Sequence, residues 1–218
     1  TLNALEFTSP FGPAVLQVSA EEASWLEKAA QQGQVGTLVT QVQRTEAEAF
    51  NVIAILKGTD STLAPVVIMT PRSGWWHCAS ERGGGLACWL SVLAALSLQR
   101  LARDVIFVAT SGHELGGIGL EFFLGQQPML AKKAKVWIHF GANLGAAFGK
   151  RWILFASNTE FAEIAANLLG KAGDDPDDCC LPHGLPCGTA RLIQSLGSRS
   201  IPRLGANHFF HPPNHLFP

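Results

Sequence analysis

The sequence predicts an α/β fold, a three-layer α/β/α sandwich around a mixed, mostly parallel sheet. Short apolar segments rich in β-branched residues alternate with longer helical segments, as expected when helices cover both faces of a sheet. Hydrophobic residues make up 47% of the 218 positions and charged residues 15%, which favours a buried sheet over a disordered chain. A chain of this length can bury one sizeable core, with no second domain of equal size.

The N-terminal part of the chain is predicted to form a helix and then a β-hairpin. Ser19 and Glu22 make a capping box, which predicts a helix that ends near Gly33. Residues 35–45 alternate between polar and apolar side chains. They are predicted to form a strand that pairs antiparallel with a second strand at residues 51–56.

The remaining elements alternate between buried strands and helices. Further strands are predicted at residues 66–69, 104–109, 136–140 and 153–156. Helices are predicted at residues 85–101, 116–124, 159–172 and 189–196. Residues 174–187 are predicted to be an irregular loop, and so is the tail after Ile201, which contains four prolines.

Charge and apolar patterning exclude several classes of partner. The chain has 16 basic and 17 acidic residues, with a net charge of -1 and no long basic run, so neither nucleic acid nor a membrane surface is expected as a partner. The longest apolar stretch, residues 85–98, is too short to span a bilayer. Because the first residue is Thr1 rather than Met, we expect a processed chain or an excerpt. Oligomeric state and compartment are left open by these patterns.

Five motifs occur in a recognisable order. They read NVIAILKG at residues 51–58, CASERGGG at 78–85, GHELGGIG at 112–119, WIHFGANLG at 137–145 and FFHPPNH at 209–215. This order resembles the zinc-dependent aminopeptidase family, which also contains plasma carboxypeptidases and glutaminyl cyclases. The family's corresponding motifs are N-V-I-A, G-A-x-D-N-x-x-G, E-E-x-G-x-x-G-S, a strand ending in Asp, and a closing loop with His. The resemblance implies the sandwich fold and a small-molecule or peptide substrate.

The resemblance also implies a division of the chain. It runs from about Asn51 to the C-terminus. Residues 1–33 are interpreted as the remnant of an accessory subdomain together with a connecting helix. Residues 34–218 are interpreted as the zinc-exopeptidase-like α/β domain without its last helix.

Most of the family's metal ligands are replaced in this sequence. The position of the first His falls near Pro71, and that of its partner Asp falls on Ser73. The general-base Glu corresponds to His113, while the fourth ligand has no equivalent, His139 being the nearest candidate. The resemblance therefore argues against the family's usual two-zinc mechanism in this chain.

At three of the family's metal-ligand positions this sequence keeps a residue that can bind a metal. The resemblance assigns metal-binding positions to Glu81, Glu114 and His211, with Glu81 one methylene longer than the family's bridging Asp. A two-metal hydrolase needs about five nitrogen and oxygen ligands. These three can hold one zinc ion at most.

Two arginines lie in the loops that would flank the metals. Arg72 follows a predicted strand, and Arg82 stands where the family has an Asn. A guanidinium can pair with a carboxylate that has lost its metal, which would otherwise be a costly buried charge. We therefore predict that Arg72 or Arg82 bridges Glu81 or Glu114, in which case no zinc is bound.

The leading functional hypothesis is a hydrolase of amide or ester bonds with an altered site. His113 would act as the base, since its ordinary pKa of about 6.5 suits neutral pH. Glu81, Glu114 and His211 would hold the single zinc ion and leave a position for water.

Two alternatives stay open. In the first, the chain is a non-catalytic descendant that binds a peptide or small ligand, with Trp75 and Trp76 available for apolar contacts. In the second, it is a metal-free serine-type esterase with Ser80 as the candidate nucleophile and His113 or His211 as its partner. Ser73 and Ser111 are further candidate nucleophiles.

Overall fold

The structure is a computed structural model that describes residues 16, 18–39, 41, 43, 45–74, 78–144, 152–174, 178–180 and 188–205. Within these residues one sheet contains β1 (Val52–Leu56), β2 (Val66–Pro71), β3 (Val105–Thr110), β4 (Val136–Phe140), β5 (Trp152–Phe155), β6 (Asp178–Cys180) and β7 (Ser200–Gly205). The helices are η1 (Ala20–Glu22), α1 (Ala23–Gln31), the π-helix η2 (Ala79–Gly83), α2 (Gly84–Ser97), η3 (His113–Leu115), α3 (Ile118–Gln126), α4 (Leu130–Lys133), α5 (Thr159–Lys171) and α6 (Thr189–Ser195).

The sheet is mixed and mostly parallel, with strand order β1-β3-β2-β4-β7-β5-β6. The pairs β3–β2, β2–β4, β4–β7 and β5–β6 are parallel, whereas β1–β3 and β5–β7 are antiparallel. In the centre, Val66 lies opposite Val105 on one side and Val136 on the other. The predicted α/β fold class is therefore confirmed.

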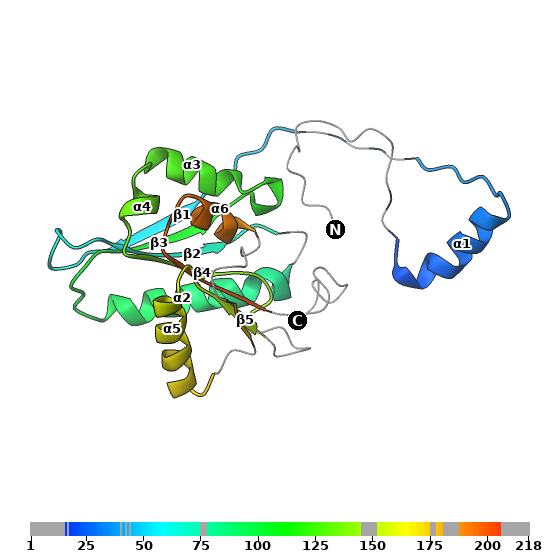
Figure 1. The fold of residues 1–218 in the computed structure, drawn as a ribbon. Helices are drawn as coiled ribbons and strands as arrows, with labels where there is room; N and C mark the ends of the chain where they lie inside the picture. Colours follow the sequence, from blue (N-terminus) through cyan, green and yellow to red (C-terminus); the bar gives the residue numbers. More distant parts are fainter. Residues whose placement is uncertain are drawn as a thin grey trace.

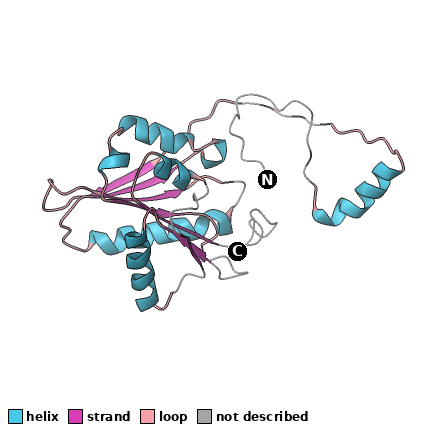
Figure 2. Ribbon diagram, viewed as in Figure 1, coloured by secondary structure: helices cyan, strands magenta, loops and turns pink. Residues whose placement is uncertain are grey.

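Helices cover both faces of the sheet, and the strand residues alternate between them (Figures 1 and 2). Val67 and Met69 of β2 pack with Leu120 of α3 and Ile193 of α6. The intervening Ile68 packs instead with Trp89 of α2. Because neighbouring strand residues point to opposite faces, one apolar strand contributes to two cores. This arrangement explains why the central strands are apolar throughout.

The helix predicted after Ser19 is present but stands apart from the sheet (Figure 1). The Ser19 side chain caps η1 by accepting a hydrogen bond from the Glu21 N–H, and α1 follows directly. No residue of η1 or α1 is buried. The assignment of residues 1–33 to an accessory subdomain remains a prediction. No helix in the described ranges is long and apolar enough to cross a bilayer.

The strand predicted at residues 35–45 is wrong. Positions 35–39, 41, 43 and 45 are not in a strand, and Val35 is 95% exposed. Among the described strands, β1 pairs with β3 alone and forms an edge of the sheet. Apolar alternation stabilises a strand only when one face is covered, and every described residue of this segment is exposed.

The tail after Ile201 is predicted to be a loop, yet residues 202–205 belong to β7. Trp137 and Gly141 donate backbone hydrogen bonds to the carbonyls of Arg199 and Arg203. The backbone N–H and C=O groups of the odd-numbered β7 residues therefore point toward β4. The backbone nitrogen of Pro202 points toward β5 instead. Proline is tolerated at this position because the β5–β7 pairing ends at Leu154 and Arg203, one residue short of Pro202. The short β6 likewise lies inside the loop predicted at 174–187.

Candidate functional site

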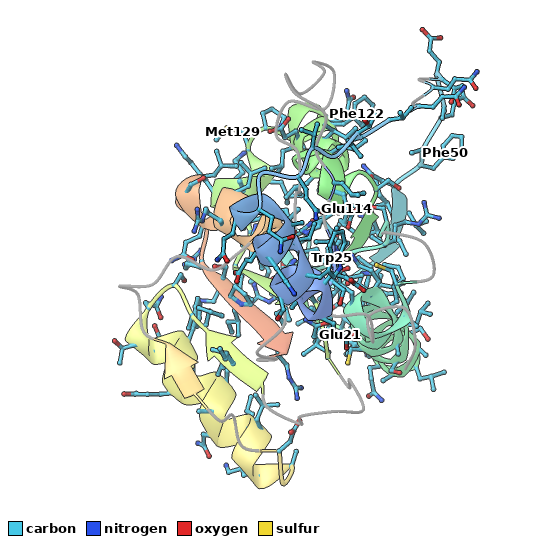
Figure 3. The ribbon with its side chains drawn as sticks, turned by 90° about the vertical axis from the view of Figure 1, so that its right-hand side faces the viewer. Glu21, Trp25, Phe50, Glu114, Phe122 and Met129 are labelled. Carbon is cyan, nitrogen blue, oxygen red and sulfur yellow. The ribbon has the colours of Figure 1, made fainter. Side chains whose placement is uncertain are left out.

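The candidate site lies at the carboxyl edge of the parallel strands. β2 leads into Arg72 and Ser73, and β3 leads through Ser111 into the η3 turn with His113 and Glu114. In open α/β sheets ligands bind at this edge. Among the side chains drawn in Figure 3, Glu114 lies within the body of the domain rather than at its periphery.

A buried ion-paired group forms the centre of this edge. Nη2 of Arg82 lies 2.8 Å from Oε1 of Glu81 and 2.6 Å from Oε1 of Glu114. The three residues are 4%, 2% and 6% exposed, respectively. The prediction that Arg72 or Arg82 pairs with Glu81 or Glu114 is confirmed for Arg82, which contacts both carboxylates. We call these three residues the Arg82 triad.

The π-helix η2 places two of the triad residues side by side. It follows Cys78, whose φ of 46° lies in the left-handed region, and leads directly into α2. π-helices are rare and often occur at functional sites. The buried Cys78 thiol lies 2.9 Å from Oε2 of Glu81 and donates to it, so both oxygens of this carboxylate are engaged. Sequence reasoning missed Cys78, because no C-x-x-C spacing marks it.

Ser73 joins the triad to the turn after β3. Its hydroxyl donates to Oε2 of Glu114 at 3.0 Å and accepts from the His113 N–H at 3.1 Å. Its carbonyl accepts from Nε of Arg82 at 2.6 Å. The resemblance places Ser73 where the family has the Asp beside its first metal ligand, but here the residue holds a guanidinium and a carboxylate in place.

The segment after β4 lies against the start of η2 and α2. The Asn143 N–H donates to the Glu81 carbonyl at 3.2 Å. A Cβ atom added to Gly84 would lie only 1.5 Å from the Leu144 carbonyl oxygen. The two backbones therefore meet at a distance that glycine alone permits.

Arg72 does not join the triad. Its Nη1 donates to the Phe50 carbonyl at 2.7 Å and to the Ser111 hydroxyl at 3.1 Å. Its side chain is thus directed toward the β1 and β3 side of the edge. Of the two arginines predicted as alternative bridges, Arg72 is the one that does not serve as a bridge.

His113 lies at the edge, half-buried in the turn that follows β3. A Cβ atom added to Gly188 would lie 2.8 Å from Cε1 of His113, so the imidazole packs against the residue before α6. The turn requires Gly112, whose φ is 68°. The predicted base is therefore near the triad, and its backbone N–H is bound by Ser73.

His139 is buried on the α6 side of the sheet. Its Nε2 lies 3.1 Å from the Thr189 hydroxyl. Burial, together with the nearby His113 and Arg82, lowers the pKa of His139 from 6.5 to about 3. The imidazole is therefore neutral at physiological pH, and it pairs with a threonine instead of a carboxylate.

The pKa of His139 predicts an acid-sensitive fold. The folded pKa is below the unfolded value, so the unfolded state binds more protons and stability falls as pH drops from 6.5 to about 3. Through His139 alone, the free energy of unfolding should fall by up to about 1.4 kcal/mol for each pH unit. Urea unfolding between pH 7 and 4 should show that the free energy of unfolding depends less on pH in His139→Gln than in wild type. The same pH dependence in both proteins would contradict the low pKa of His139.

Four of the residues singled out from the sequence fall outside the described side chains. His211 lies beyond the described residues, as do Trp75 and Trp76, and only the backbone of Ser80 in η2 is described. The hydroxyls of the other two candidate nucleophiles donate elsewhere, that of Ser73 to Glu114 and that of Ser111 to the Phe50 carbonyl.

The sequence matches no protein-family model and no curated protein. The fold, however, matches solved structures. A zinc aminopeptidase from Bacillus subtilis superposes with a TM-score of 0.62 at 17% identity, over 76% of this chain and 44% of that one. The LapA aminopeptidase of Legionella pneumophila gives 0.60 at 16% identity, over 89% and 56%. A glutaminyl cyclase from an Acidobacteriales bacterium gives 0.56 at 13% identity, over 73% and 60%.

This chain has the aminopeptidase fold. It spans less than two thirds of each of these structures. At these identities the likeness concerns the arrangement of strands and helices rather than the chemistry at the edge.

The two carboxylates described at the edge of this aminopeptidase fold lie against an arginine. Among the described side chains, no group of three or more His, Cys, Asp or Glu residues is placed to hold a metal ion. The two carboxylates at the edge both face the Arg82 guanidinium. A zinc ion bound to these carboxylates would have to displace a guanidinium that is itself 4% exposed.

Proposed function

We propose that this chain binds a peptide or a peptide-like small molecule at the carboxyl edge of its sheet, and that Arg82 stands in place of zinc there. The observation that supports this is the guanidinium between Glu81 and Glu114, within 2.8 Å of both. One positive charge offsets the two negative charges in part, and it leaves the group with a formal charge of -1. The chain would thus keep the fold of the peptidases without their two-zinc hydrolysis.

The energetics of the Arg82 triad oppose metal binding. Breaking a buried ion pair costs about 3–5 kcal/mol, because it leaves a charge without compensation. Here the second oxygen of each carboxylate is also bound, by Cys78 on Glu81 and by Ser73 on Glu114. A zinc ion would have to break these contacts as well and leave Arg82 buried without a counter-ion.

The ligand class is inferred from chemistry and from the fold. Structures with this fold are named as aminopeptidases and a glutaminyl cyclase, proteins named for peptide and glutaminyl substrates. The edge of this chain offers charged and hydroxyl groups from the turns after β2 and β3. Such groups can bind the amide and terminal groups of a peptide without any bond being cleaved.

We expect protein purified without chelator to contain far less than one zinc per chain. Its thermal midpoint should not change when EDTA or an equivalent of zinc is added, since the carboxylates are already paired. Elemental analysis and paired melting curves would measure this. Aminoacyl anilides should not be hydrolysed in a chelator-sensitive way. Stoichiometric zinc together with EDTA-sensitive hydrolysis would overturn the proposal.

A zinc-independent hydrolase is the second candidate, favoured by the half-buried His113 beside the triad. Hydrolysis that resists EDTA and disappears in His113→Ala would support it over pure binding. The matched control is Arg100→Gln, an exposed change just after α2. Loss of ester hydrolysis to a serine-directed phosphonate would instead point to Ser80.

A further inference from the structure

The backbone of Arg72 is held at the end of the central sheet. Its N–H donates to the Thr110 carbonyl at 2.8 Å, which extends the β2–β3 ladder by one residue. The side chain leaves this point at an exposed position. Arg72 therefore combines a backbone fixed by the sheet with an exposed side chain.

The guanidinium itself is fixed on one side. Nη1 donates to the Phe50 carbonyl and to the Ser111 hydroxyl, at 2.7 and 3.1 Å. Ser111 is in turn bound by Asn51, whose side-chain oxygen accepts the Ser111 N–H while its amide donates to the Gly119 carbonyl. Residues from three separate segments, at 50–51, 111 and 119, thus form the hydrogen-bond network that holds the Arg72 side chain.

The other edge of the guanidinium has no partner among the described residues. In the described part of the chain no carboxylate pairs with Arg72, and its Nε and Nη2 take part in no hydrogen bond. These two nitrogens form the edge through which an arginine binds a carboxylate bidentately. An arginine fixed at Nη1 loses less conformational freedom when that edge is filled.

The neighbouring charges leave Arg72 available. The guanidinium of Arg82, the nearest arginine along the chain, is already divided between Glu81 and Glu114. Arg72 is therefore the arginine at this edge whose charge is not offset by a described carboxylate. Phe50, which supplies one anchoring carbonyl, carries a side chain that is 66% exposed and labelled in Figure 3.

We propose that Arg72 is an anion-binding residue whose Nε–Nη2 edge receives a carboxylate of the ligand. Ligands of this site would then be peptides or N-acyl amino acids with a free carboxylate, and an apolar group beside it could contact Phe50. This proposal rests on the proposed function, because it assigns a ligand class to the same edge.

Two probes that differ in one group test the proposal, N-acetylphenylalanine and its primary amide. We expect the arginine Nε–Hε NMR signal of Arg72, assigned by its loss in Arg72→Lys, to move with the acid and not with the amide. Arg72→Gln should bind the acid about tenfold more weakly or worse, since a charge-assisted bidentate contact is lost. Ser111→Ala, which removes one anchor, should weaken binding severalfold while the charge remains.

Arg100→Gln is the matched control, and it should bind the acid as wild type does. Backbone NMR spectra of each variant establish whether the fold is retained, and Arg72→Lys keeps a charge if the glutamine variant unfolds. Equal binding of acid and amide would overturn the role of Arg72 and leave peptide binding intact. Failure of both probes, and of peptides in general, would overturn the proposed function together with this inference.

Discussion

Replacing Arg82 by methionine is expected to destabilise the protein by about 3–5 kcal/mol, because two buried carboxylates lose their counter-ion. Glu81 and Glu114 are 2% and 6% exposed and cannot exchange the guanidinium for water without opening the edge of the sheet. Methionine keeps much of the length of the side chain, so packing changes little. Urea unfolding at neutral pH would measure the change.

A second-site rescue distinguishes the lost charge from lost packing. Adding Glu81→Gln and Glu114→Gln to the Arg82→Met background should recover part of the stability, since the uncompensated charges are gone. Coupling between such neighbours is typically about 0.5–3 kcal/mol. Arg100→Met, at an exposed position after α2, should cost less than about 0.5 kcal/mol. An Arg82 variant as stable as that control would contradict the buried triad.

Alanine at Gly84 is expected to cost at least about 3 kcal/mol, beyond the usual range for overpacking. The added Cβ would lie 1.5 Å from the Leu144 carbonyl oxygen, so backbone rather than a flexible side chain must move. That movement would also strain the hydrogen bond from Asn143 to Glu81. Urea unfolding and loss of the native NMR spectrum would report it.

The adjacent glycine provides the control. Gly83 has helical φ and ψ of -57° and -44°, and a Cβ added there meets nothing within 4 Å. Gly83→Ala should therefore be neutral or stabilise the protein by about 0.5–1 kcal/mol. Similar losses for the two variants would show that the close approach at Gly84 is not as described.

The elements that the sequence predicts well are those whose local signals and burial agree. β4 occupies the predicted residues 136–140, and α5 begins after Asn158, whose side chain accepts the Phe161 N–H as a helix cap. The elements that it misses depend on distant partners. Pro202 reads as a loop residue until β4 and β5 supply the two sides of β7. Residues 35–45 carry strand periodicity, but their described positions pair with no strand.

The same distinction between local signals and distant partners applies to the residues of the site. Charge balance alone predicts that an arginine pairs with Glu81 or Glu114, because an unpaired buried carboxylate is costly. Which arginine does so depends on backbone geometry, since η2 turns Arg82 inward while the carbonyl of Phe50 holds Arg72 outward. The thiol on Glu81 and the threonine on His139 come from residues to which no motif position assigns a role in the site. Distances between such residues belong to the fold and cannot be read from spacing.

The central cation of this edge is part of the polypeptide. A site built of nitrogen and oxygen donors for a divalent ion must be loaded after synthesis, and copper or nickel can compete for it. Arg82 sits next to Glu81 in the chain, so η2 brings this pair together, and the turn after β3 adds Glu114. The positive charge that Arg82 supplies to both carboxylates is therefore encoded in the amino-acid sequence.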